Sequence, residues 1–163
     1  MERRIRAIIL IIGVAIFGMS VLCSCGVNDI DISGYGDEEI ILRGISSEDI
    51  IVTIDDLKAL KCKTIRTEST SDKIGTVKAT GPELDTLLAE YGVSKSDFAK
   101  IKIYGSDEYD CRLQKEYFTE HDMYLAFGIN GEPLDAESAP CRLIIPESDS
   151  AYWVRMINMI EFE

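Results

Sequence analysis

Few side chains in this sequence have the type and spacing needed for chemistry. The only histidine, His121, has no cysteine or second histidine near it, so it lacks a partner for metal binding or for activating a nucleophile. We expect it in a solvent-facing turn. There is no Gly-x-Ser-x-Gly element, and neighbouring acids such as Asp55 and Asp56 are common in so acidic a chain. The sequence therefore predicts no catalytic residue and no metal site.

Arg142 is the candidate ligand-binding residue. It precedes the apolar run 143–145, which Pro146 closes and which is typical of a strand covered on both faces. An arginine bordering a buried strand must keep its guanidinium in water or find an anion. The turn-forming pair Asn130-Gly131 opens the loop that leads to it. The alternative is a surface arginine that pairs with a nearby carboxylate.

Three of the five cysteines lie beyond the N-terminal segment. Cys62, Cys111 and Cys141 lack Cys-x-x-Cys spacing, which argues against a zinc site and a thioredoxin-like motif. Two of them could form a disulfide in an exported chain and leave the third free. We expect three buried thiols instead, because isolated cysteines commonly serve as small core residues.

Residues 1–25 have the pattern of an export signal. Three arginines precede an apolar run over residues 7–17, which is shorter than the roughly 20 residues that a membrane-spanning helix prefers. An uncleaved anchor is the alternative. The segment Leu22-Cys23-Ser24-Cys25-Gly26 resembles the bacterial lipobox, which implies cleavage before Cys25 and lipidation of its sulfur. Cys23 has a poorer context, because Ser20 replaces leucine three positions before it. Two or more acyl chains would give durable membrane attachment.

The net charge restricts the partners. Residues 1–24 hold one acid and three arginines of the 29 acids and 17 bases, so cleavage before Cys25 leaves 28 acids against 14 bases. Such a surface argues against binding nucleic acid and against adsorption to anionic lipid, since both require a basic face. We expect an exported protein that the N-terminal lipid holds at the outer face of the bacterial cytoplasmic membrane, or at the outer membrane if the host has one.

The remaining chain predicts one domain. Residues 26–37 are rich in glycine and aspartate, without helical periodicity, and are expected to be a flexible tether. Residues 38–163 alternate short apolar strands with short helices, which indicates an α+β fold with a mixed sheet in which strands dominate. We expect strands over 39–43, 62–67, 101–104, 109–113, 123–127, 143–145 and 159–162. We expect helices over 54–60, 81–91 and 114–118, and a helical turn over 150–154.

The order of these pieces resembles the sulfite-oxidase-type oxidoreductase molybdopterin-binding domain family. The resemblance covers roughly residues 38–163 and rests on four stretches. They are Thr53–Leu60, Thr80–Leu88, Tyr104–Tyr109 and the segment 130–146, which reads Asn-Gly-Glu-Pro-Leu and then Pro-x-Arg-Leu-Ile-Ile-Pro before the pair Tyr152-Trp153. It implies a sulfite-oxidase-like fold whose cofactor cleft is bordered by residues 68–72, Arg112 and Arg142.

The resemblance also implies where a molybdenum ligand would stand. In catalytic members, a cysteine at the end of the strand expected here over 62–67 binds the metal, and that place falls on Glu68 or Ser69. Neither supplies a soft thiolate. Cys62 lies at the opposite end of the strand, more than about 15 Å away if the strand is extended. The histidine often found ahead of the Pro-x-Arg element is replaced near Ser138.

The sequence therefore favours a degenerate family member without redox chemistry. Its partners would be a cell-surface protein or a small anionic ligand, and molybdopterin is the cofactor that the resemblance leaves open. The alternative is an exported molybdopterin-dependent oxidoreductase, or a subunit of one, with electron-transfer partners.

Overall fold

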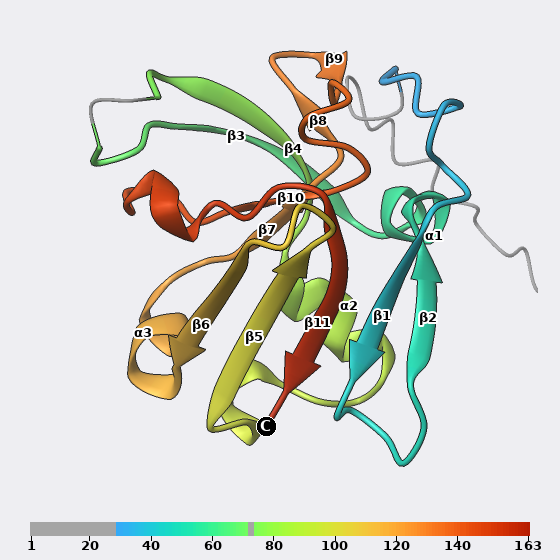
Figure 1. Ribbon diagram of the computed structural model, residues 1–163, viewed down its shortest axis with the longest axis vertical. Coiled ribbons are helices and arrows are strands. Elements are labelled where there is room, and N and C mark those ends of the chain that lie inside the picture. The colour runs from blue at the N-terminus through green and yellow to red at the C-terminus, as the bar shows by residue number, and fades with distance from the viewer. Residues whose placement is uncertain (1–28, 72–73) are drawn as a thin grey trace, which may run out of the picture.

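A computed structural model describes residues 29–71 and 74–163 (Figure 1). The expected signal segment 1–25 lies outside this described part. Within it, no helix has the length and apolar character needed to cross a membrane.

Strands joined by short helices make up the described chain. The strands are β1 (Glu39–Arg43), β2 (Ile50–Thr53), β3 (Cys62–Thr67), β4 (Val77–Pro82), β5 (Lys100–Gly105), β6 (Asp110–Gln114), β7 (Tyr124–Ala126), β8 (Gly128–Ile129), β9 (Glu132–Pro133), β10 (Arg142–Ile144) and β11 (Ile157–Phe162). The helices are α1 (Ile54–Ala59), α2 (Leu84–Glu90) and α3 (Lys115–Glu120), with the 3-10 turns η1 (Lys95–Asp97) and η2 (Ser150–Tyr152). The expected strand-dominated α+β fold is confirmed.

A five-stranded sheet in the order β2-β1-β11-β5-β6 forms one half of the molecule (Figure 1). β1 pairs with β11 in parallel and the other neighbours are antiparallel, so the sheet is mixed. Alternation sets the buried face, because Ile101 and Ile103 of β5 are fully buried while Lys102 between them is not. In this strand order, β11, the last strand of the described chain, lies between β1 and β5 in the centre of the sheet.

The other half holds a four-stranded sheet, β3-β4-β8-β9, and the pair β10-β7. Asn130 (φ 56°) and Gly131 (φ 86°) form the expected tight turn between β8 and β9. The expected buried strand is also present, because Leu143, Ile144 and Ile145 have no exposed surface. Arg142 begins this strand, as the sequence predicted.

Gly81 and Pro82 do not begin a helix, and this part of the sequence prediction is wrong. They end β4, and α2 begins only at Leu84. A Cβ atom at Gly81 would lie 2.0 Å from the Leu125 carbonyl oxygen, so the close approach of β4 and β7 requires glycine there. Leu84, Leu87 and Leu88 form the buried face of α2, Tyr91 at the end of the expected helix is 37% exposed, and Gly92 follows at φ 70°.

Residues 29–37 pack on the domain, unlike the flexible tether expected over 26–37. The side chains of Ile30, Ile32 and Tyr35 are buried in the core. The Tyr35 hydroxyl donates to the Phe127 carbonyl oxygen at 2.6 Å and accepts from the Leu134 amide nitrogen at 2.8 Å. Three apolar side chains spaced by polar residues gave too short a pattern to indicate a docked segment. We call residues 29–37 the docked strap.

His121 also differs from its expected solvent-facing position. It follows α3, where its ring stacks on Tyr117 with a centroid distance of 4.2 Å and its Nδ1 lies 2.8 Å from the Tyr117 carbonyl oxygen. Its main-chain carbonyl oxygen accepts a hydrogen bond from the buried Lys95 ammonium. These contacts give the histidine a structural role.

Acid should weaken one ion cluster on the five-stranded sheet. The ammonium groups of Lys100 and Lys102 bind the Glu163 carboxylate and lower its pKa from 4.5 to about 2. A depressed carboxyl pKa contributes stability above the unfolded pKa, and this contribution is lost as the pH falls towards 2. The difference in urea midpoint between the native chain and Glu163→Gln should therefore shrink between pH 5 and pH 2.

The exposed Glu48, which forms no ion pair with described residues, supplies the control Glu48→Gln. A difference that is constant with pH would contradict the assignment.

Candidate functional site

Trp153 lies at the centre of the candidate site, just after η2. Its indole Nε1 donates to the Ile145 carbonyl oxygen at 2.9 Å and to the Ser148 hydroxyl at 3.0 Å. The turn before it is capped by Asp149, whose side chain accepts from the Ala151 amide at 2.9 Å. Hydrogen bonds to the segment after β10 and the capped turn η2 therefore hold the tryptophan in place, and only 3% of its surface is exposed.

Arg142 lies beside this ring with a partly unsatisfied guanidinium. Its Cζ is 5.7 Å from the Trp153 ring centroid, which is cation–π contact. Its Nε is buried and has no hydrogen-bond partner, and no carboxylate of the described residues forms an ion pair with it. The alternative of a carboxylate-paired surface arginine is thus wrong. Burial lowers the pKa of Arg142, and the positive charge of Arg155 lowers it further. A half-buried cation in this state favours an added anion.

A small hollow of about 180 Å³ adjoins Arg142. It is lined by Ile129, Pro133, Leu134, Asp135, Ser138 and Arg142. Five of these residues, all except Arg142, come from the β8–β9 hairpin and the loop after it, so the Asn130-Gly131 turn positions one wall of the hollow.

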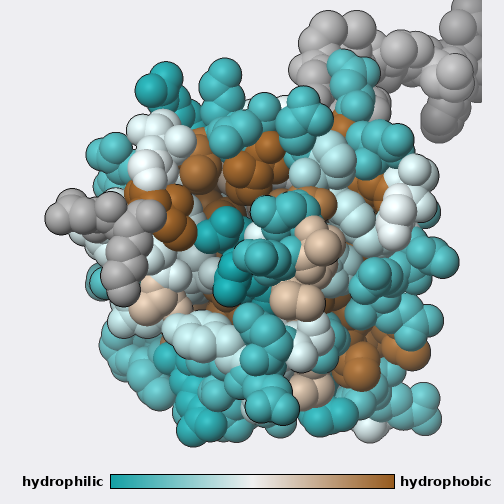
Figure 2. All heavy atoms as spheres, turned by 45° about the horizontal axis from the view of Figure 1, so that its top comes forward, coloured by the Kyte–Doolittle hydropathy of each residue, from teal (hydrophilic) through white to brown (hydrophobic). Residues whose placement is uncertain are grey.

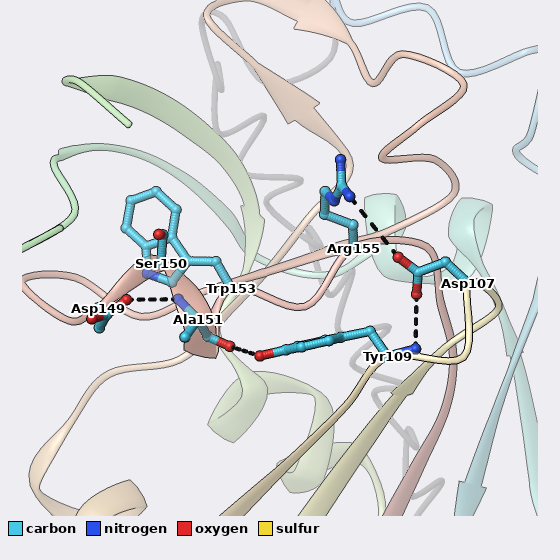
Figure 3. Close-up of a pocket in the computed structure, with 7 residues that line it drawn as sticks. All are labelled: Asp107, Tyr109, Asp149, Ser150, Ala151, Trp153 and Arg155. Carbon is cyan, nitrogen blue, oxygen red and sulfur yellow. Dashed lines mark hydrogen bonds and ion pairs between the residues drawn. The ribbon is translucent and has the colours of Figure 1, made fainter. Parts of the chain in front are cut away.

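A second hollow, of about 270 Å³, is lined by Trp153 together with residues of η2 and the β5–β6 hairpin (Figure 3). Arg155 and Asp107 face each other there, with the Arg155 guanidinium nitrogen 4.0 Å from the Asp107 carboxylate. The Tyr109 hydroxyl donates to the Ala151 carbonyl oxygen at 2.5 Å, so the β5–β6 hairpin is joined to η2. The lining carries charges of both signs, which suits a polar ligand with its own donors and acceptors.

The loop after β3 is attached to η2 by serine side chains. The Ser71 hydroxyl lies 2.6 Å from that of Ser150 and the Ser69 hydroxyl 2.9 Å from that of Ser71. The Ser69 hydroxyl also donates to the Ser148 carbonyl oxygen at 3.2 Å. Since Ser148 contacts the indole of Trp153, the loop and the tryptophan belong to one connected cluster.

β3 ends at Thr67, as the sequence predicted, and Glu68 and Ser69, where the resemblance places the molybdenum ligand, follow directly. The Thr67 side chain is buried, and its hydroxyl accepts from the Glu147 amide nitrogen at 3.4 Å. It lines a third hollow, of about 410 Å³, together with Glu68 and Glu147. The β-branched run 64–67 in the sequence already marked Thr67 as the last strand residue. The end of β3 therefore presents the hydroxyl of Thr67, with the carboxylates of Glu68 and Glu147 lining the same hollow.

The three thiols are free, and none of them lines the hollow at the end of β3. Cys62 is half-buried at the start of the strand and donates to the Leu57 carbonyl oxygen at 3.4 Å. Cys141 is completely buried. Cys111 is buried on β6 and borders a hollow near Tyr109. Burial raises the pKa of both Cys62 and Cys111 to about 11, so both are protonated at neutral pH. The expectation of three buried thiols therefore holds for Cys111 and Cys141, whereas Cys62 is only partly buried.

The groove expected from residues 68–72, Arg112 and Arg142 is brought together only in part. Trp153 links Ser69 and Arg142 through the contacts above, whereas Arg112 pairs with Asp110 at 3.0 Å and lines a neighbouring hollow that shares Tyr109, Asp149 and Ala151 with the one beside Trp153. Sequence reasoning placed Trp153 on its turn and missed its contact with Arg142, because no local pattern reports which side chains meet across β10. The face turned forward in Figure 2 is largely hydrophilic, with hydrophobic side chains exposed between the polar ones.

These elements define a sulfite-oxidase-type molybdopterin-binding domain. The chain matches the oxidoreductase molybdopterin binding domain over residues 39–163, and it belongs to that family. Among solved structures, it is similar to the sulfane dehydrogenase SoxCD from Paracoccus pantotrophus, with a TM-score of 0.65 and 22% sequence identity. That match covers 78% of this chain and 38% of the other, so the chain spans well under half of that relative, and the likeness shows the fold. The comparison with curated proteins found no match.

Proposed function

We propose that this chain is an exported lipoprotein whose molybdopterin-type domain binds a ligand and performs no molybdenum redox chemistry. The lipobox-like segment ending at Cys25 supports lipid anchoring outside the cytoplasmic membrane, or at the outer membrane where the host has one. The fold supports a binding role because scaffolds persist when the chemistry of their sites changes.

The observation that carries this proposal is the lack of a thiol at the end of β3, where Thr67 ends the strand and Glu68 and Ser69, the positions that the resemblance assigns to the metal ligand, follow it. A molybdenum centre of this family takes a cysteine thiolate there, and an alcohol or a carboxylate is a poor substitute for that soft ligand. The neighbouring acids Glu68 and Glu147 line the same hollow, while Asp107 and Asp149 line the hollow beside Trp153. These carboxylates oppose a phosphate-bearing pterin. The described residues therefore do not fit the cofactor.

The ligand that suits the remaining site is a small anion. Arg142 offers a buried Nε–H without a partner and stacks its guanidinium on Trp153, an arrangement that fixes the direction of its donors. The adjoining hollow of about 180 Å³ has room for a group of carboxylate or sulfate size. Asp135 also lines this hollow, and the positive charges of Arg142 and nearby Arg155 outnumber the charge of that one carboxylate. Ser138, which lines this hollow, could donate a further hydrogen bond.

Replacing Arg142 with methionine should abolish specific anion binding without unfolding the protein. Methionine keeps an unbranched stem against Trp153 and removes the unsatisfied Nε, so the unliganded free energy of unfolding should stay within about 1 kcal/mol of the native value. In the native chain, sulfate at ten times its Kd should add about 1.4 kcal/mol. Urea unfolding in sulfate and in chloride of equal ionic strength measures both effects.

The matched control is Arg112→Met. Arg112 is exposed and pairs with Asp110, so its replacement should leave the sulfate effect unchanged. Sulfate also stabilises proteins without binding to a site, and that general contribution should appear in every variant. An equal sulfate effect in the native, Arg142→Met and Arg112→Met chains would remove Arg142 from the proposed site.

Metal and pterin analysis of protein purified from its native host tests the absence of redox chemistry. We expect far less than one molybdenum atom and one pterin per chain. Family membership favours the competing function, an exported molybdopterin-dependent oxidoreductase or a subunit with electron-transfer partners. Stoichiometric molybdenum would establish that function in place of ours. Mass spectrometry of the N-terminal peptide would separately show whether Cys25 carries acyl chains.

A further inference from the structure

The docked strap places the start of the folded chain at one end of the molecule. A Cβ atom on Gly128 would lie 2.4 Å from Ile30 Cδ1, so Ile30 packs directly on β8. The Lys58 ammonium donates to the Ile30 carbonyl oxygen at 2.7 Å, which ties the same residue to α1. Together with the Tyr35 contacts, these interactions fix the strap against the β8–β9 hairpin and α1.

The chain between the strap and the proposed lipid site is short. Four residues lie between Cys25 and Ile30, and the five Cα–Cα steps that join them span about 17 Å when the chain is fully extended. A domain of this size is about 35 Å across, so a path over its surface from one end to the other is about 55 Å. A lipid on Cys25 therefore cannot reach the end of the domain opposite the strap.

We infer that the domain stands on the membrane with its β8–β9 end towards the bilayer. This inference rests on the proposed lipid anchor at Cys25. In Figure 1 the strap and β9 lie at the top, whereas the connection between β1 and β2 and the C-terminus lie at the bottom. The hollow beside Arg142 shares Ile129 and Pro133 with this hairpin, so the candidate site lies in the membrane-proximal half. Its ligand or partner must be accessible close to the bilayer.

We expect the short connection, and not adsorption to lipid, to impose the orientation. The exposed acids Asp29, Asp31 and Glu132 lie around the strap and the hairpin beside Lys58 and Lys78, so this end is not a basic face. Like charges repel these carboxylates from an anionic bilayer, and the repulsion extends about one Debye length, about 8 Å at physiological salt. The domain is thus held near the membrane without lying on it.

Fluorescence quenching of the acylated protein in vesicles tests this orientation. The full-length lipoprotein, purified from membranes, would carry a fluorescent non-natural side chain at Glu132 in β9 or at Ser47 between β1 and β2, both exposed positions. Phosphatidylcholine–phosphatidylglycerol vesicles would contain a lipid with a spin-labelled headgroup. We expect several-fold stronger quenching at position 132 than at position 47. Equal quenching, or stronger quenching at 47, would overturn the inference.

A longer connection provides the matched control. Twenty Gly/Ser residues inserted between Val27 and Asn28 lie outside the described domain and add up to about 70 Å of reach. The preference for position 132 should then fall towards equality, and a preference that persists would show that lipid contacts orient the domain, contrary to our inference. Mass spectrometry of the same samples separates the two proposals. An unacylated Cys25 would overturn both, whereas acylation with equal quenching would overturn only the orientation.

Discussion

Gly81→Ala should destabilise the domain by about 4 kcal/mol or more, enough to leave much of the protein unfolded. The added methyl group would lie 2.0 Å from the Leu125 carbonyl oxygen, and its other close neighbours are also backbone atoms of β7. Backbone in a paired strand cannot move aside as the end of a flexible side chain can. Urea unfolding followed by circular dichroism would measure the loss.

Gly75→Ala is the control for this prediction. No heavy atom would lie within 4 Å of the added Cβ, so the free energy of unfolding should change by about 0.5 kcal/mol or less. The comparison also decides between the two interpretations of this segment. If Gly81 began a helix, as its sequence suggests, alanine would be neutral or stabilising. Such a result would contradict the close β4–β7 contact.

Tyr35→Phe should lower the free energy of unfolding by about 2–4 kcal/mol, although only one oxygen atom is removed. That oxygen satisfies both the Phe127 carbonyl and the Leu134 amide, and both bonds are buried. The substitution would leave each group without its partner in a site too well packed for water to replace it. Hydrogen exchange should also show faster exchange of the amides in the docked strap.

Tyr91→Phe provides the same chemical change at an exposed position. The Tyr91 side chain is 37% exposed, and we expect a change of about 0.5 kcal/mol or less. If the two variants were equally stable, residues 29–37 would not be docked in solution. The orientation inferred above would then lose its geometric basis.

Local patterns were sufficient for much of the fold. The predicted strands 39–43 and 62–67 match β1 and β3, because alternating or β-branched runs between turn residues leave few other backbone choices. The predicted helix over 81–91 began too early, because glycine and proline are common at helix starts as well as at strand ends. Only the distant β7 backbone distinguishes the two, and no local sequence pattern contains that contact.

The sequence predicted one residue of the candidate site, Arg142, but it did not predict which other side chains meet there. Arg142 stood out because a charge beside a buried strand needs a partner, and the structure shows that this need is unmet. The contact with Trp153 and the opposition of Arg155 and Asp107 join segments far apart in the chain. Arg112 was grouped with Arg142 by resemblance alone, and its ion pair with Asp110 takes it elsewhere.

The central place of β11 has a consequence for how the protein acquires its structure. β11 separates β1 from β5, so the five-stranded sheet cannot close until residues 157–162 have left the ribosome. Pairing the first strand with the last encloses a long loop, which makes folding slow. The unfinished chain would expose apolar strands during that delay, and we expect it to depend on chaperones for its solubility until translation is complete.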